Sequence, residues 1–316
     1  MIKTVFCGSP EFAAASLRYL TKQPINLCAV VTMPDKKTGR GQHIQYNPVK
    51  LAALEHNLLV LQPEKATDPS FLDTLRALKP DVIAVVAYGK ILRPQFLSVP
   101  RYACINLHGS LLPKYRGPSP IHAALLNGDT ITGLTTFVIQ ESVDSGPMIL
   151  DTKVPIESND TLGTLHDKLA HAGALLLAQT LLLFENGMPR ITEQNHALAT
   201  FTEKITPDMA LIDWSQPAVT IRNKIRAFNP FPGAYTYMVI NGKHKAVKLF
   251  SAQIVPAGFS PVSGSITVNE NSFSIQCGTD ALLITELQPE GKKRMHTDEF
   301  IRGYRLSETA ILDGQK

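Results

Sequence analysis

Short apolar runs with the length of a β-strand alternate with amphipathic segments in the amino-terminal part of the chain. The apolar runs cover residues 2–7, 26–32, 58–61, 81–87 and 103–108. Helices are predicted between them, with Ser9 as the N-cap of the first and Asn47 before Pro48 as the N-cap of the second. Because strands alternate with helices, we predict an α/β fold whose parallel strands are covered on both faces.

The pattern changes near residue 190. Before it, a helix is predicted over 119–126, strands over 133–139 and 148–154, and a long helix from Asp160-Thr161 to Asn186-Gly187. Residues 190–206 are polar without a clear period, and one helix over 217–228 precedes short alternating runs that are separated by turn residues. We therefore predict an α/β domain over 1–189, a linker over 190–206 and a small β-barrel domain over 207–316.

The composition is that of a globular protein with a substantial core. The 316 residues are enough for two domains, hydrophobic residues make up 44%, and the net charge of +4 permits an anionic partner without requiring one. The apolar run 174–184 is too short to span a bilayer, and the amino terminus enters a strand directly, so we expect no signal peptide. The scattered cysteines Cys7, Cys28, Cys104 and Cys277 are expected to be free thiols in the cytosol.

The most informative polar residues stand at the end of the strand over 103–108. Asn106 and His108 are two residues apart, which places both side chains on one face of a strand. A loop stiffened by Gly109, Pro113 and Gly117 follows, and the carboxyl ends of strands are where open α/β sheets bind ligands. A lone histidine is more often structural than catalytic, and on these residues alone both interpretations stay open.

Asp144 is the natural third member of such a site, because a carboxylate beside an imidazole fixes the orientation of the ring. The alternative is an ordinary aspartate in a surface turn. Ser110 is not part of a nucleophile elbow, so covalent catalysis is not predicted. No histidine pair has the spacing of a metal-binding helix, and we predict no metal. An amide, an imidazole and a carboxylate can perform acid–base catalysis and stabilise an oxyanion, which suits attack of an amine on an acyl carbon.

Two basic clusters carry no catalytic pattern. One contains Lys37 and Arg40 in the loop predicted over 33–47, and the other contains Lys292, Lys293 and Arg294 in the predicted barrel. Exposed lysines often serve only solubility, but their concentration on a barrel also suits a groove for a polyanion. An active-site domain joined to a basic barrel indicates an enzyme whose substrate is attached to a nucleic acid.

Several segments together resemble the formyltetrahydrofolate-dependent formyltransferases. The resemblance rests on the segments Phe6–Phe12, Pro34–Gly41, Val85–Leu92, Ile105–Pro113, Arg116-Gly117, Asp144–Gly146, Arg226–Pro230 and Leu287–Met295. These segments are spread over nearly the whole chain. Within the family, the chain is most similar to the bacterial members that act on methionyl-tRNA.

The resemblance implies a Rossmann-like catalytic domain and an OB-like carboxy-terminal domain. It implies formyl transfer from 10-formyltetrahydrofolate to the α-amine of methionyl initiator tRNA, with Asn106, His108 and Asp144 as catalytic residues. It implies a folate pocket and contacts with tRNA. The folate residues are Ser110, Leu111, Leu112, Pro113, Tyr88, Gly89, Ile91 and Leu92, and the tRNA residues are Arg40, Lys37, Lys292, Lys293 and Arg294.

The sequence departs from the family pattern at Gln42-His43, where further lysines are common, and at Tyr115, where a tryptophan is common. Three other functions share the catalytic segment: formyl transfer to a small amine such as an amino sugar or a glycinamide ribonucleotide, hydrolysis of formyltetrahydrofolate, and tRNA binding by an inactive enzyme. The basic barrel and the Arg40 loop favour tRNA as the acceptor. We expect a cytoplasmic monomer.

Overall fold

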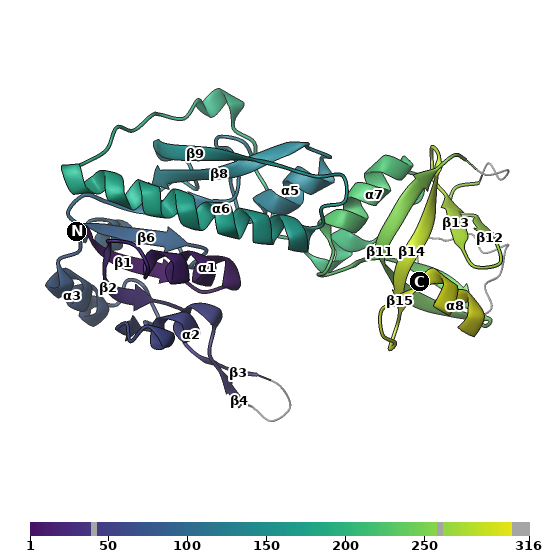
Figure 1. Cartoon of the computed structure of the whole chain (residues 1–316), viewed down its shortest axis with the longest axis horizontal. Helices are drawn as coiled ribbons and strands as arrows, with labels where there is room; N and C mark the ends of the chain where they lie inside the picture. Colours follow the sequence, from purple (N-terminus) through teal and green to yellow (C-terminus); the bar gives the residue numbers. More distant parts are fainter. Residues whose placement is uncertain (39–42, 258–261, 305–316) are drawn as a thin grey trace. The chain divides into compact units, whose positions relative to one another are not determined.

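A computed structural model describes residues 1–38, 43–257 and 262–304 of the chain (Figure 1). The chain divides into two compact units. The first comprises Met1–Pro120, Ile131–Pro155 and His166–Thr202, and the second comprises Ile121–Thr130, Ile156–Leu165 and the residues from Glu203 onwards. Two short segments that precede residue 190 therefore belong to the second unit, so the units do not follow one another as continuous stretches of sequence. The boundaries 1–189, 190–206 and 207–316 stay a prediction.

A seven-stranded sheet forms the centre of the first unit, in the order β5-β2-β1-β6-β7-β8-β9. Its strands are β1 (Lys3–Gly8), β2 (Asn26–Val31), β5 (Val60–Leu61), β6 (Val82–Val86), β7 (Ala103–His108), β8 (Ile131–Val138) and β9 (Met148–Pro155). The strands from β5 to β7 are parallel, whereas β8 and β9 continue the sheet antiparallel. Every residue of β6 is buried, as its unbroken apolar run predicts. The mostly parallel, Rossmann-like sheet is confirmed.

Helices cover both faces of this sheet. They are α1 (Glu11–Leu20), α2 (Pro48–Glu55), α3 (Pro69–Leu78), α4 (Pro94–Leu97) and α6 (Leu162–Leu183), while α5 (Pro120–Leu126) lies largely in the second unit. On one face, Phe71 of α3 and Phe96 of α4 pack against Val5 and Cys7. On the other, α6 approaches the sheet so closely that a Cβ on Gly173 would lie 2.9 Å from Leu107.

The segment Leu162–Asn186 is long and apolar enough to cross a membrane by length and composition, but 56% of its most apolar window is buried inside the fold. That burial is typical of a core helix of a globular protein.

Two local predictions in the first unit need correction. Helix α1 has Pro10 as its N-cap without a side-chain cap, and the Ser9 hydroxyl accepts a hydrogen bond from the Met33 backbone N–H instead (3.3 Å). The Ser9 hydroxyl contacts Met33 because the carboxyl ends of the paired strands β1 and β2 lie side by side. The region predicted as a loop over 33–47 contains an antiparallel hairpin of β3 (Lys36–Thr38) and β4 (His43–Gln45).

The second unit is built on a six-stranded antiparallel sheet, as predicted for a small barrel-like domain. Its strands are β10 (Ala234–Ile240), β11 (Lys243–Val255), β12 (Ile266–Val268), β13 (Phe273–Gln276), β14 (Ala281–Pro289) and β15 (Met295–His296). Helices α7 (Ala218–Ala227) and α8 (Thr297–Gly303) pack on it. Its core contains Trp214, Phe228, Phe273 and Phe300, and the Trp214 indole donates to the Thr236 hydroxyl (3.0 Å).

The polar segment predicted as a linker is closely associated with the first unit up to Thr202. It contains the short 3-10 helix η2 (His196–Leu198) and lies between η1 (Phe184–Asn186) and η3 (Pro207–Ala210). Thr192 forms a β-bridge with Met148 at the start of β9, and Phe201 forms one with Arg116. Backbone and polar side-chain hydrogen bonds attach this segment to the first unit. Such contacts need no periodic apolar side chains, so the sequence of the segment shows no hydrophobic period.

Candidate active site

The carboxyl end of β7 brings Asn106 and His108 to the edge of the sheet. Asn106 is paired with Val85 of parallel β6 on one side and with Phe137 of antiparallel β8 on the other. Its side chain is half-buried, and its amide makes no hydrogen bond within the described part of the chain. An amide fixed on a central strand and left without a partner is suited to donate to a bound substrate.

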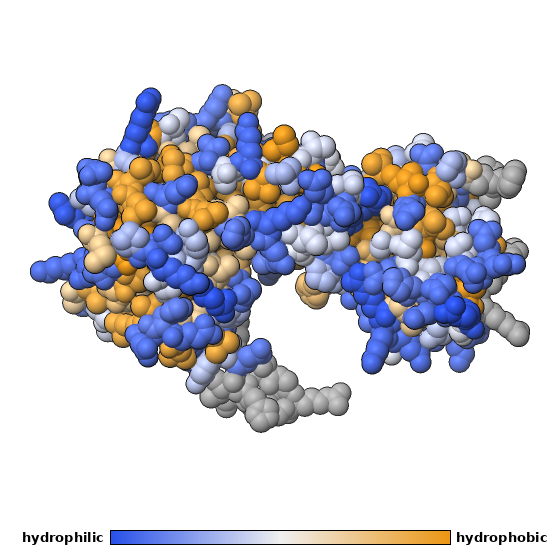
Figure 2. Space-filling view, viewed as in Figure 1, coloured by the Kyte–Doolittle hydropathy of each residue, from blue (hydrophilic) through white to orange (hydrophobic). Residues whose placement is uncertain are grey.

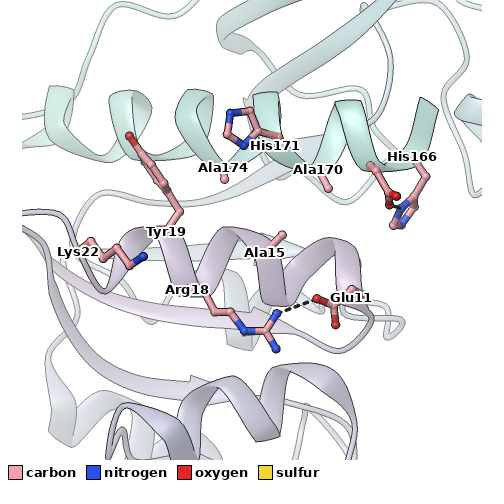
Figure 3. A pocket seen from close by; sticks show the side chains of 10 residues that line it. Glu11, Ala15, Arg18, Tyr19, Lys22, His166, Ala170, His171 and Ala174 are labelled. Atoms are coloured by element: carbon pink, nitrogen blue, oxygen red, sulfur yellow. Dashed lines mark hydrogen bonds and ion pairs between the residues drawn. The ribbon is translucent and has the colours of Figure 1, made fainter. Parts of the chain in front are cut away.

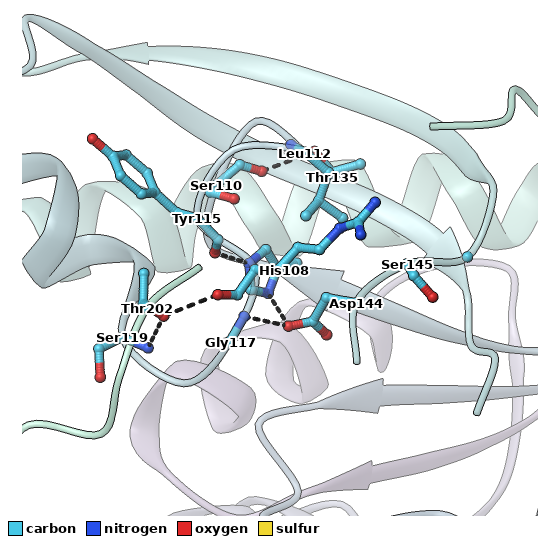
Figure 4. A network of polar contacts seen from close by, with 12 residues as sticks. His108, Ser110, Leu112, Tyr115, Gly117, Ser119, Thr135, Asp144, Ser145 and Thr202 are labelled. Carbon is cyan, nitrogen blue, oxygen red and sulfur yellow. Dashed lines mark hydrogen bonds and ion pairs between the residues drawn. The ribbon is translucent and has the colours of Figure 1, made fainter. Parts of the chain in front are cut away.

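His108 lies between two partners that orient its ring (Figure 4). The ring is 6% exposed, its Nε2 lies 2.9 Å from the Tyr115 carbonyl oxygen, and its Nδ1 lies 3.7 Å from Asp144 Oδ2. Because a carbonyl only accepts hydrogen bonds, Nε2 carries a proton in this arrangement. Nδ1 then faces the carboxylate, where one further proton can be held between imidazole and Asp144.

Asp144 is held by the loop that follows β7. The Gly117 backbone N–H donates to Asp144 Oδ2 (2.8 Å), and Asp144 itself has a left-handed φ of 48°. Gly117 has a φ of 109°, and a Cβ there would lie 2.6 Å from the Thr202 carbonyl oxygen. Only glycine fits this position without strain. The structure thus brings together the three residues predicted as catalytic.

The loop Gly109–Ser119 is held by hydrogen bonds at several points along its length. The Leu112 N–H donates to the Thr135 hydroxyl (3.1 Å), which in turn donates to the Ser110 carbonyl (2.8 Å). Tyr115 adopts a φ of 61°. These hydrogen bonds position the Tyr115 carbonyl and the Gly117 N–H that contact His108 and Asp144.

The residues predicted for the folate pocket separate into two groups. The Ser110 side chain is fully buried and donates to the Lys114 carbonyl, and Leu112 is also buried. The Tyr88 ring packs among Cys7 and Phe96 in the core, where burial raises the pKa of its phenol. These three side chains are buried in the fold, and their place in a folate pocket stays a prediction.

The other predicted folate residues reach the surface. Gly89 and Ile91 are exposed, with Ile91 at 78%, and Leu92, Leu111 and Pro113 are half-buried. The loop Ala87–Leu92 follows β6, whose end lies beside that of β7. Ile91 is thus the one exposed apolar side chain of this group, and the role of the group in folate binding stays a prediction.

The predicted tRNA residues also differ from one another. Lys292 and Lys293 are exposed in the turn between β14 and β15, a part of the second unit whose visible face is largely hydrophilic (Figure 2). Arg294 is paired with the Glu286 carboxylate and lies 4.3 Å from the centre of the Phe250 ring, and its role as a tRNA contact stays a prediction. Arg40 and the Lys37 side chain lie outside the described residues.

A separate cavity of about 430 Å³ lies between α1 and α6 (Figure 3). It is lined by residues that include Arg18, Tyr19, His166 and His171, and it contains none of the predicted site residues. Arg18 is engaged with Glu11 (2.7 Å), so the cavity offers no free guanidinium.

Sequence reasoning missed Arg116, Gln194 and Thr200 as parts of the site. Arg116 and Gln194 are 4% exposed, and all three take part in hydrogen bonds around the Asp144 turn and the loop after β7. Gln194 and Thr200 stand in a polar run without periodicity, so no hydrophobic pattern marked them. Arg116 entered only as part of a motif.

Comparison with known proteins identifies the family. Residues 2–181 match the family model described as formyl transferase, and residues 204–305 match that of the formyl transferase C-terminal domain. The chain belongs to the formyl transferase family. This formyl transferase is 42% identical to the methionyl-tRNA formyltransferase of Caldanaerobacter subterraneus subsp. tengcongensis, over 98% of the chain and 100% of the relative. It is 44% identical to that of Desulforamulus reducens, over 98% of both proteins.

Solved structures share its fold. The N-formyltransferase of Helicobacter canadensis, in complex with folinic acid and dTDP-3-aminofucose, superimposes with a TM-score of 0.69 at 20% identity, over 92% of this formyl transferase and 100% of that chain. At this identity the similarity shows a common fold only. It does not identify the acceptor substrate of this formyl transferase.

Proposed function

We propose that this formyl transferase moves a formyl group from 10-formyltetrahydrofolate to the α-amino group of methionyl initiator tRNA. The observation that carries the proposal is its similarity, end to end, to relatives named methionyl-tRNA formyltransferase. Formyl transfer to an amino sugar is the alternative, supported only by a fold shared at 20% identity. Free buried thiols such as Cys7 and Cys104 suit a cytoplasmic enzyme, and we propose that it works as a monomer.

The described residues fit a folate donor at the edge of β7. Ile91 exposes 78% of its surface beside the strand end, and Leu92 and Leu111 present half-buried apolar side chains. An apolar wall beside a few convergent polar groups is the usual composition of a ligand site. The donor supplies a formyl carbonyl attached to nitrogen. Because the enzyme consumes it, it is a substrate rather than a resident cofactor.

The mechanism is direct attack of the acceptor amine on the formyl carbon. The amine lone pair forms the new C–N bond, and the carbonyl π electrons move to oxygen. The Asn106 amide is without another partner and donates to this oxygen. Once the His108–Asp144 pair has taken up the proton of the amine, the imidazolium adds a positive charge close by, so the negative charge on oxygen is stabilised by a preorganised donor and a nearby cation.

Collapse of the adduct requires one proton to move. The amine nitrogen loses a proton as its new bond forms, and the folate nitrogen gains one as its bond to the formyl carbon breaks. The His108–Asp144 pair, with Nδ1 and Oδ2 3.7 Å apart, holds this proton between the two steps. The reaction therefore needs no covalent bond between the formyl group and the enzyme, which agrees with the lack of a nucleophile elbow at Ser110.

The purified full-length protein, 10-formyltetrahydrofolate and methionyl initiator tRNA test the proposal directly. We expect formylmethionyl-tRNA, with free methionine and dTDP-amino sugars as poor acceptors. Formation of a formylated amino sugar at a higher kcat/KM than formylmethionyl-tRNA would overturn the choice of acceptor. Release of free formate at the same rate with and without charged tRNA would instead indicate a hydrolase.

The double substitution Lys292→Gln/Lys293→Gln is expected to weaken tRNA binding through lost charge. Both side chains are exposed, while the turn that carries them is held by its backbone, in which the Lys292 N–H donates to the Pro289 carbonyl (3.0 Å). The slope of log K against log salt concentration is negative, and each lost phosphate contact reduces its magnitude by about 0.7–0.9. Filter binding over a salt series measures this slope.

A matched control is Lys22→Gln/Lys65→Gln, which removes two exposed charges from the first unit. Equal slopes for the two double variants would contradict a tRNA contact at the β14–β15 turn. The KM for the folate donor is expected to stay the same in both.

A further inference from the structure

Gln194 is a buried amide in a segment that is otherwise mostly exposed and polar. It exposes only 4% of its surface, and its immediate neighbours Glu193 and Asn195 are exposed. Its Nε2 donates to the carbonyl oxygens of Asp144 (2.9 Å) and Gly146 (2.7 Å). One side chain thus holds both ends of the turn that presents the Asp144 carboxylate.

Arg116 fixes which way the Gln194 amide points. The Nε and Nη2 atoms of the buried Arg116 both donate to Gln194 Oε1, at 3.1 and 2.7 Å, and Nη2 also donates to His196 Nδ1 (2.9 Å). Because guanidinium groups only donate, the amide oxygen must face Arg116. The amide nitrogen is therefore directed to the two carbonyls.

These contacts close a ring around Asp144. Its backbone carbonyl is bound by Gln194, Gln194 is bound by Arg116, and the residue after Arg116 is Gly117, whose N–H binds the Asp144 carboxylate. Both the backbone and the carboxylate of Asp144 are held, one from each side. A single residue with a left-handed φ is thereby kept in one conformation.

The same segment also holds the partner of His108. The Tyr115 N–H donates to the Thr200 hydroxyl (2.8 Å), and the Arg116 N–H donates to the Thr200 carbonyl (2.8 Å). Thr202 donates from its N–H to the Arg116 carbonyl (2.7 Å). The Tyr115 carbonyl, which binds His108 Nε2, is therefore positioned by residues 200–202 (Figure 4).

We propose that residues 194–202 form a strap that sets the His108–Asp144 geometry, with Gln194 as the positioning residue for Asp144. The inference rests on the roles proposed above for His108 and Asp144. It adds that this segment belongs to the catalytic apparatus although it touches no reacting atom. Displacement of a catalytic group by about 1 Å can cost 10²-fold in rate, so loss of the strap lowers kcat rather than substrate affinity.

Gln194→Glu separates the two functions of the amide. The new carboxylate still accepts from Arg116, but it cannot donate, and it faces the carbonyls of Asp144 and Gly146. The expected result is a kcat lower by about 10–100-fold, with KM for both substrates unchanged within about twofold. Asn195→Asp is the matched control, because it makes the same chemical change on an exposed neighbour whose side-chain oxygen still caps the Ala197 N–H.

A second readout does not depend on turnover. In the apo enzyme, the imidazole NMR signal of His108 is expected to titrate differently in Gln194→Glu and to match wild type in Asn195→Asp. Identical titration curves and identical kcat in the two variants would overturn the inference. An inactive wild-type enzyme would instead count against the proposed acceptor, and the titration would still test the strap.

Thr200→Val is a second, independent test of the strap that does not depend on the folding of Gln194→Glu. Thr200 is exposed, and valine keeps its shape while removing the oxygen that accepts from Tyr115. A kcat decrease in Thr200→Val that Thr200→Ser restores, at constant KM, supports the strap. Wild-type kcat in Thr200→Val together with wild-type His108 titration contradicts it.

Discussion

Replacement of His108 by alanine is expected to lower kcat for formyl transfer by about three orders of magnitude, because general acid–base catalysis and oxyanion stabilisation are lost together. The ring is 6% exposed, and its two nitrogens contact Tyr115 and Asp144, so no neighbouring group replaces it. The affinity for tRNA is expected to persist, since His108 is a buried residue of the first unit, whereas the exposed Lys292 and Lys293 belong to the second unit.

The measurement is single-turnover formylation with saturating enzyme, followed by filter binding of tRNA to the same protein. His171→Ala is a suitable control, because that imidazole is exposed on α6 and belongs to the separate cavity beside α1. Turnover of the His108 variant within about tenfold of wild type would contradict the proposed role of His108 as a proton carrier. A parallel loss of tRNA binding would assign His108 a structural role instead.

Most of the scaffold could be predicted from apolar patterning. The unbroken run in β6 predicted a strand covered on both faces, and the Asn106/His108 spacing predicted two side chains at one sheet edge. Both predictions depend on local periodicity, which sequence displays directly. Approach of Asp144 to His108 depends on a turn distant in sequence, so the sequence could suggest the pair but not its geometry.

The features that patterning missed are polar and buried. Family motifs predict Ser110 and Tyr88 for the folate pocket, and the structure shows the Ser110 hydroxyl bonded inside its own loop and the Tyr88 ring in the core, so their place in the pocket stays a prediction. Gln194 was placed in a linker because polar residues usually indicate solvent exposure. Hydrogen bonds can bury a polar side chain without any periodic signal, and that is how residues 194–202 join the site.

Two substitutions of Asn106 distinguish the loss of a donor from the addition of charge. Asn106→Ala removes an amide that makes no hydrogen bond within the described residues, so the fold is expected to be preserved. Removal of one oxyanion donor costs about 10²–10³ in kcat. Asn106→Asp keeps the shape but places a carboxylate where negative charge develops, and its loss is expected to be larger still.

The order of the two variants is the informative result. If Asn106 donates to the developing oxyanion, aspartate is slower than alanine and the gap widens as pH rises, because the carboxylate is then fully charged. Asn57→Asp, on an exposed turn residue, controls for net charge. If Asn106 only positions a substrate, both variants raise KM and leave kcat similar, and the amide then binds the ground state as tightly as the transition state.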